Sequence, residues 1–217
     1  MTTESVPSGL FAHRREGVRL RLILVRHGDV AESFRGRCCG SSDPELSERG
    51  RDQLRWARGL LRASSAAALY SSPRRRALES AHLLTQQVPM TTDSRLSEID
   101  FGLLEGLTYQ EIAERHPEVW QTWMDNPTAV AFPGGESFSA FCARVDELLS
   151  DLRSRHDAQA VIAVTHGGVG RVVLALALGL ELRCMFRLQQ SCGGVSVIDF
   201  YDRDAVVQLM NASPIGA

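Results

Sequence analysis

Two patterns of hydrophobic and polar residues alternate along this chain. Short apolar runs bounded by polar segments are typical of buried strands, whereas apolar residues that recur every three or four positions indicate helices. The first pattern predicts strands at 19–25, 66–70, 160–164, 195–201 and 205–210, with a further short strand expected after Val88. The second predicts helices at 48–62, 73–84, 109–115, 138–152 and 168–178. This alternation predicts a three-layer α/β/α sandwich with a mixed, mainly parallel central sheet.

Capping residues support three of these helices. Ser47 and Ser72 stand where N-caps are expected, and Pro73 would follow at the first helical position, where its missing N–H costs nothing. Thr108 and Glu111 form a capping box. The segment 117–133 contains tryptophans and prolines but shows little periodicity, so we expect it to cover the functional site.

Composition narrows the class of protein. The chain has 217 residues, 44% of them apolar, which predicts one α/β domain over 18–217 behind a loose tail over 1–17. The tail lacks an apolar signal-peptide core and no apolar run is long enough to span a membrane, so we expect a cytoplasmic protein. A formal net charge of −2 gives no footprint for nucleic acid or an anionic membrane, and neither is expected as a partner.

The five cysteines are odd in number and lack the paired spacing of a zinc site. Reduced thiols are therefore expected rather than a disulfide framework. Cys38 and Cys39 are adjacent, and neighbours in sequence rarely both reach one metal ion.

Two predicted strands end in the same dipeptide. His27-Gly28 follows the run that ends in Leu24-Val25-Arg26, and His166-Gly167 follows the run 160–164. The carboxyl ends of strands are where open α/β sheets hold their ligands. A guanidinium matches phosphate oxygens and an imidazole nitrogen can attack phosphorus, so the pair of motifs predicts a phosphoryl-transfer site.

Four sequence blocks resemble the histidine phosphatase superfamily, also called phosphoglycerate mutase-like. They occur in the family's order and roughly its spacing, within about residues 19 to 200, and read LVRHG, SSPRRRALESA, LSEIDFGLLEG and VTHGG. The segments GRCCGSSDPELSERG and PGGES are most similar to the small-phosphatase branch, which includes alpha-ribazole phosphatase-like proteins.

The resemblance implies a role for each matching residue. His27 corresponds to the phosphorylated histidine, Arg26 and Arg76 to phosphate clamps, and His166 to the second histidine. Gly167 would offer its amide to an oxyanion at a helix start. His27 must present one neutral nitrogen to phosphorus while the other donates to a carbonyl, for which the Gly28 region is one candidate. Arg74 and Arg75 are expected to face solvent.

Glu98 matches the family's proton donor to the leaving oxygen, with Asp100 and Glu105 as rival carboxylates. A carboxyl close to bound phosphate is pushed toward its protonated form, which suits a general acid.

Several positions depart from the family pattern. Val30 stands where a hydroxyl donor is common, and Gly168 where phosphoglycerate mutases usually carry Asn. No paired-arginine insert of the mutase kind is found. The remaining substrate-binding candidates complete a set that comprises Arg26, Ser33, Cys39, Gly40, Arg76, Glu98, His166 and Gly167.

These features favour a phosphomonoesterase that works through a phosphohistidine on a small-molecule phosphate ester, without a cofactor or metal. A phosphoglycerate-type mutase and a catalytically weak phosphate-binding module are the alternatives. A metal-dependent phosphatase is a weaker option, because no clustered Asp/His ligand set is present. The sequence leaves the ester and the oligomeric state open, and a homodimer is compatible with it.

Overall fold

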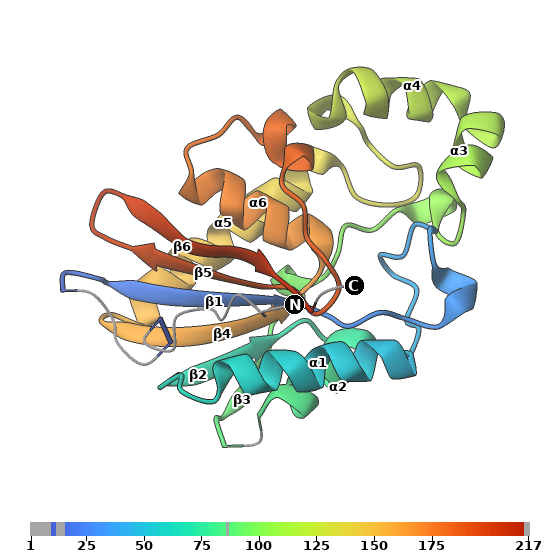
Figure 1. Cartoon of the computed structure of the whole chain (residues 1–217). Helices are drawn as coiled ribbons and strands as arrows, with labels where there is room; N and C mark the ends of the chain where they lie inside the picture. Colours follow the sequence, from blue (N-terminus) through green and yellow to red (C-terminus); the bar gives the residue numbers. More distant parts are fainter. Residues whose placement is uncertain (1–9, 12–15, 86, 215–217) are drawn as a thin grey trace, which may run out of the picture.

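The central feature of the fold is a mixed sheet, seen here in a computed structural model that describes residues 10–11, 16–85 and 87–214. The strand order is β3-β2-β4-β1-β5-β6 (Figure 1). Parallel pairing joins the first four strands in this order, whereas β5 is antiparallel to β1 and β6 is antiparallel to β5. The strand bounds are β1 (Leu20–Arg26), β2 (Ala68–Ser71), β3 (Met90–Thr92), β4 (Gln159–Thr165), β5 (Val195–Phe200) and β6 (Ala205–Ala212).

Helices cover both faces of this sheet. Figure 1 shows α1 (Glu48–Leu61) and α2 (Arg75–Leu84) on one face, with α5 (Phe138–Arg155) and α6 (Gly167–Ala177) on the other. Successive residues of a strand point to opposite faces. In β1, Leu20, Leu22 and Leu24 accordingly join the apolar cluster of the α5–α6 face, whereas Ile23 and Val25 join the α1–α2 cluster. The predicted three-layer α/β/α architecture with a mainly parallel sheet is confirmed.

The segment 117–133 is more regular than its sequence pattern suggested. It contains α4 (Pro117–Asp125) and the short 3-10 helix η4 (Pro127–Ala129), and α4 follows α3 (Tyr109–Arg115) at the rim of the molecule (Figure 1). Pro117 occupies the first turn of α4, and Trp123 packs edge-on against the ring of Phe132. Packing between aromatic rings brought together by the fold has no helical period, so the sequence pattern did not reveal the helix. Further 3-10 helices are η1 (Glu32–Phe34), η2 (Ser94–Leu96), η3 (Gly102–Leu104) and η5 (Leu182–Arg187).

Two of the three predicted caps are confirmed. Ser47 accepts a hydrogen bond from the Gly50 amide, and the capping box of α3 is complete. Ser72 does not cap α2, because that helix begins at Arg75 with Arg74 in the N-cap position. The Ser72 hydroxyl instead lies against a ring nitrogen of His166.

Part of the expected tail is packed rather than loose. The Phe11 side chain is buried in the α1–α2 cluster, and the carbonyl of Leu10 accepts a hydrogen bond from Arg21. These apolar residues remove surface from water by packing on the domain. The rest of the tail up to residue 15 lies outside the described residues. All five cysteines are free thiols, and no helix in the described part of the chain is long and apolar enough to cross a membrane.

Candidate active site

The two histidines of the His-Gly motifs lie side by side at the carboxyl ends of neighbouring parallel strands. Arg26 of β1 pairs in register with Thr165 of β4, so the next residue of each strand is a histidine. The amide of His27 donates to the carbonyl of Thr165 over 2.9 Å. The two imidazole rings are 5.1 Å apart between centroids, and both are buried. Sheet pairing therefore brings together residues that are far apart in the sequence.

The hydrogen bonding of His27 defines its tautomer. Its Nδ1 lies 2.7 Å from the carbonyl oxygen of Gly28, which can only accept, so Nδ1 carries the proton. Burial, together with the positive charges of Arg26 and Arg76, holds the pKa of His27 well below its usual range. The imidazole is therefore neutral, and its Nε2 carries the lone pair that a nucleophile needs. The acceptor is the Gly28 carbonyl, within the region that the sequence suggested.

His166 is engaged at both ring nitrogens. Arg76 Nε donates to His166 Nδ1 over 3.2 Å, so Nε2 carries the proton and donates to the Ser72 hydroxyl over 2.8 Å. Burial and the charge of Arg76 hold its pKa well below the usual range. Although His166 occupies the N-cap position of α6, its side chain makes no capping hydrogen bond. In this arrangement it links Arg76 to Ser72 and keeps no nitrogen free for a phosphate oxygen.

Arg76 is the largest fully buried side chain of the protein's described residues. Beyond His166, its guanidinium donates to three backbone carbonyls of one loop, those of Ser42 at 2.6 Å, Cys39 at 2.9 Å and Gly40 at 3.1 Å. These acceptors are neutral and Arg76 forms no ion pair among the described residues, so no carboxylate in direct contact neutralises its charge beside His27. The loop thus fixes the guanidinium without neutralising it.

Arg26 carries a donor without a partner. One terminal nitrogen donates to the Gln190 carbonyl over 2.6 Å, but its buried Nε has no hydrogen-bond partner among the described residues. The side chain lies against Gly167, the first residue of α6, whose amide belongs to the group that a helix leaves without an internal acceptor. An orphaned Nε and a free helix-start amide form a donor pair suited to an anion.

Glu98 also contacts the start of α6. Its carboxylate accepts from the Gly168 amide over 3.0 Å and from the Ile99 amide over 3.1 Å. A Cβ at position 168 would lie 2.2 Å from Glu98 Oε1, so the contact requires glycine there. An Asn at position 168, as in the mutase pattern, would displace this carboxylate.

Arg144 of α5 fixes the segment that carries Glu98. Its guanidinium donates to the carbonyls of Arg95, Ser97 and Glu98 at 2.8, 2.8 and 3.1 Å. It is held in turn by a bidentate ion pair with Glu136, at 2.7 and 2.9 Å. One side chain thereby ties the backbone of residues 95–98 to α5.

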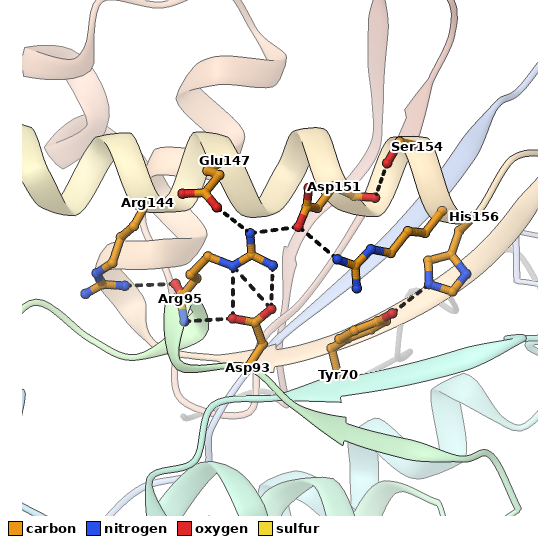
Figure 2. A network of polar contacts seen from close by, with 9 residues as sticks. Tyr70, Asp93, Arg95, Arg144, Glu147, Asp151, Ser154 and His156 are labelled. Carbon is orange, nitrogen blue, oxygen red and sulfur yellow. Dashed lines mark hydrogen bonds and ion pairs between the residues drawn. The ribbon is translucent and has the colours of Figure 1, made fainter.

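A second set of ion pairs supports the same segment. Figure 2 shows Arg95 between Asp93 on its own segment and the carboxylates of Glu147 and Asp151 on α5. The Thr165 hydroxyl also donates to the Leu96 carbonyl over 2.7 Å. The backbone before Glu98 is therefore anchored both to α5 and to the strand end that precedes His166.

The rival carboxylates face backbone amides. Glu105 accepts from the amides of Gly40, Ser41, Ser42 and Phe101, and from the Ser42 hydroxyl. Despite its burial, these bonds lower the pKa of Glu105, which favours the ionised form. Asp100 accepts from the Gly102 amide. Glu105 is thus committed to holding the loop that contacts Arg76, whereas Glu98, which accepts from two amides, lines the cavity together with His27.

His27, Arg26, Arg76 and Glu98 line one cavity of about 300 Å³, whereas His166 is not among the residues that line it. Cys39 also lines it, and burial raises the pKa of its thiol, so the group is protonated. Besides His166, two other predicted contacts, Ser33 and Gly40, do not lie in the cavity wall formed by the described residues. Ser33 is exposed and its carbonyl accepts from Arg37, while Gly40 is buried with its amide on Glu105. Gly40 is required for a different reason, since a Cβ there would lie 1.9 Å from the Ile99 carbonyl.

The assignment from the sequence did not include Arg171 and Tyr109, which also line the cavity. Arg171 lies one helical turn after Gly167 on α6, a spacing that could have indicated it. Arg74 was also placed wrongly: it is half-buried and donates to the Ser41 carbonyl, whereas Arg75 is exposed as expected. Among the described residues, no group of three His, Cys, Asp or Glu side chains is arranged to hold a metal ion.

A neutral imidazole nucleophile, uncompensated guanidinium groups, a helix-start amide and a nearby carboxyl define a phosphoryl-transfer site. The chain belongs to the histidine phosphatase superfamily, branch 1, whose family model matches residues 22–213. It is a phosphatase of small phosphate esters.

Individual relatives align with most of the chain. It is 33% identical over 196 residues to phosphoserine phosphatase 1 of Hydrogenobacter thermophilus, covering 88% of this chain and 92% of that one. It is 34% identical over 215 residues to a bifunctional protein of Mycobacterium tuberculosis, covering 97% of this chain but 58% of the relative's length. The crystal structure of a putative alpha-ribazole-5'-P phosphatase from Escherichia coli superposes with a TM-score of 0.83 at 27% identity, covering 92% of this chain and 99% of the other.

Proposed function

We propose that the protein hydrolyses a small phosphate monoester through a covalent phosphohistidine on His27, without a metal ion. The observation that carries this proposal is the tautomer of His27, whose Nδ1–H is held by the Gly28 carbonyl so that Nε2 faces the cavity as a base. The nitrogen attacks phosphorus, the P–O bond to the alcohol breaks, and water later cleaves the P–N bond to release inorganic phosphate.

The charge that develops on the phosphoryl oxygens is stabilised by groups already in place. Arg26 offers its unpartnered Nε, Gly167 its amide, and Arg76 its uncompensated charge. Phosphoryl transfer needs mostly positioning and such electrostatic stabilisation, so these donors supply what a metal ion provides in other phosphatases.

Glu98 is proposed as the acid that protonates the leaving alkoxide, and in the second step as the base that takes a proton from water. Its contact with the Gly168 amide, one residue after the glycine against which Arg26 lies, supports this role. His166 is proposed as a positioning residue that holds Arg76 through Nδ1, rather than as a donor to phosphate.

A phosphoglycerate-type mutase is disfavoured by Gly168, which the Glu98 contact requires. As to the substrate, the relative named as a phosphoserine phosphatase supports an ester whose alcohol is a small polar metabolite. We place the protein, on these grounds, among phosphatases of such esters.

The test is labelling with an alkaline quench. Protein mixed with a ³²P-labelled substrate and quenched in alkali should carry an acid-labile, base-stable phosphate that the His27→Ala variant lacks. Turnover at the wild-type rate by His27→Ala would contradict the proposal. His82→Ala is the matched control, because His82 is exposed on α2 and outside the cavity.

A further inference from the structure

A third arginine in the cavity lacks an acidic partner. Arg171 Nε donates to the Leu188 carbonyl over 2.9 Å, and no ion pair of the described residues involves its guanidinium. Arg171 lines the cavity, and its terminal nitrogens are not among the buried atoms that lack a partner. Burial and the nearby charge of Arg26 lower its pKa, and the opposing effects of Glu98 and Tyr109 do not cancel them, so the cation occupies an unfavourable electrostatic environment. A partly buried cation of this kind is stabilised when a bound ligand provides the missing negative charge.

Two other arginines that line the cavity, Arg35 and Arg37, are already paired. Arg35 bonds Asp29 over 2.6 Å, and Arg37 bonds Glu111 over 3.0 Å. Arg171 therefore differs from Arg35 and Arg37 in having no ion-pair partner among the described residues.

Arg171 and Arg26 lie on the same side of Gly167. A Cβ at that position would be 3.2 Å from Arg171 Nη1 and 3.4 Å from Arg26 Cζ. Arg171 therefore lies next to Arg26, the proposed phosphate clamp. It is also close enough to Tyr109 to affect it: burial raises the pKa of Tyr109, and the positive charge of Arg171 acts in the opposite direction. A group attached to the phosphate through a few bonds can reach it.

The charges in the cavity point to the nature of that group. Arg26, Arg76 and Arg171 form no ion pair with a carboxylate of the described residues, and the charge of Glu98 acts on Arg76 and Arg171 only from beyond ion-pair distance. A phosphate monoester dianion balances two of these three cations. Glu98 adds no negative charge when it is protonated to act as the acid. One cation is left for one further anionic group, and a guanidinium binds a carboxylate through two parallel hydrogen bonds.

We propose that Arg171 binds a carboxylate carried by the alcohol part of the substrate, so that the enzyme prefers phosphorylated hydroxy acids to neutral phosphate esters. This inference rests on the proposed function, which it narrows to a class of substrate.

The experiment compares matched esters that differ only in the carboxylate: 3-phosphoglycerate with glycerol 1-phosphate, and phosphoglycolate with 2-hydroxyethyl phosphate. Wild-type kcat/KM should favour the acid in at least one pair by about 10-fold or more, since a hydrogen bond to a charged group is worth about 10- to 100-fold. Arg171→Met should bring that ratio close to one, and Arg171→Lys should keep part of it. Arg35→Met is the matched control, an arginine at the same cavity that already has a partner, and it should retain the ratio.

Three outcomes would overturn the inference: no preference in the wild type, an equal loss with acid and neutral esters in Arg171→Met, or no loss with either. An equal loss assigns Arg171 to the phosphate itself. If the Met variant does not fold, product inhibition of the wild type decides, because glycerate should inhibit more strongly than glycerol. Failure here is distinct from failure of the proposed function, which depends on labelling of His27 and not on the ratio between esters.

Discussion

The anchoring of the acid loop by Arg144 gives a prediction that separates stability from catalysis. In the Arg144→Met variant the carbonyls of Arg95, Ser97 and Glu98 lose a donor, and the Glu136 carboxylate loses its bidentate partner. Both charged side chains are about four-fifths buried, with 20% and 19% of their surface exposed. Removing one partner of a buried pair costs about 3–5 kcal/mol, and the residual exposure places the expected loss near the lower end, about 3 kcal/mol.

The kinetic effect should depend on the leaving group. A displacement of about 1 Å in a catalytic group can cost about 100-fold in rate. An alkyl phosphate, which leaves as a basic alkoxide, should therefore lose on the order of 100-fold in kcat, whereas p-nitrophenyl phosphate, which needs little protonation, should lose clearly less. Chemical denaturation measures the first effect, and steady-state kinetics at a temperature well below the melting transition measures the second.

Arg153→Met provides the matched control. Arg153 also lies on α5, stacks on the ring of Phe200 as Arg144 does on Phe141, and donates to the carbonyl of Tyr201. It is remote from Glu98, so its loss should lower stability without any dependence on the leaving group. If Arg144→Met slows both esters by the same factor, the reasoning that links Arg144 to the acid is wrong.

Four further predictions follow from the site. Glu98→Gln should lose about two to four decades in rate with an alkyl ester and clearly less with p-nitrophenyl phosphate, and equal losses would exclude it as the acid. EDTA should leave the rate unchanged while vanadate inhibits, and loss of activity in EDTA that a divalent ion restores would contradict metal independence. Gly168→Ala should resemble Glu98→Gln in its leaving-group dependence, because the added Cβ would lie 2.2 Å from Glu98 Oε1; wild-type kinetics would show that the contact is dispensable. The pKa values of His27 and His166 are lowered on folding, so the unfolded chain binds more protons than the folded one below about pH 6.5. The free energy of unfolding should therefore fall from pH 7 toward pH 5 by up to about 1.4 kcal/mol per pH unit for each histidine. Urea titrations at several pH values should show a shallower dependence of this free energy on pH for His166→Gln, and an unchanged dependence would refute the assignment.

The sequence predicted best what depends on local pattern. The runs that became β1 and β4 identified where His27 and His166 would stand, since a histidine that directly follows a buried strand lies at the strand's end. The rule for parallel sheets then placed both at the ligand edge. The capping residues of α1 and α3 could be read in the same way, because a cap and its helix are contiguous.

What the sequence did not reveal depends on contacts between distant segments. Ser72 has the composition of an N-cap, but its hydroxyl meets His166 on another strand. Arg171 comes shortly after the His166-Gly167 motif but is not part of it. Only the folded cavity shows that its guanidinium has no acidic partner among the described residues. The resemblance favoured Glu98 over Glu105 as the acid, but the sequence did not show that Glu105 is held by the amides of the 40–42 loop and of Phe101.

The bonds of Glu105 restrict how this enzyme can change its specificity. One carboxylate joins the 40–42 loop, which cages Arg76, to the turn at Phe101, which follows Glu98. The phosphate clamp and the acid are therefore parts of one rigid unit, and neither can be shifted to admit a larger alcohol without disturbing the other. The α3–α4 segment stands at the rim, outside this unit (Figure 1), and contributes Tyr109 and Trp123 to the cavity wall. Substitutions there can reshape the space for the alcohol while the chemistry stays intact, so new substrates should arise in α3–α4 first.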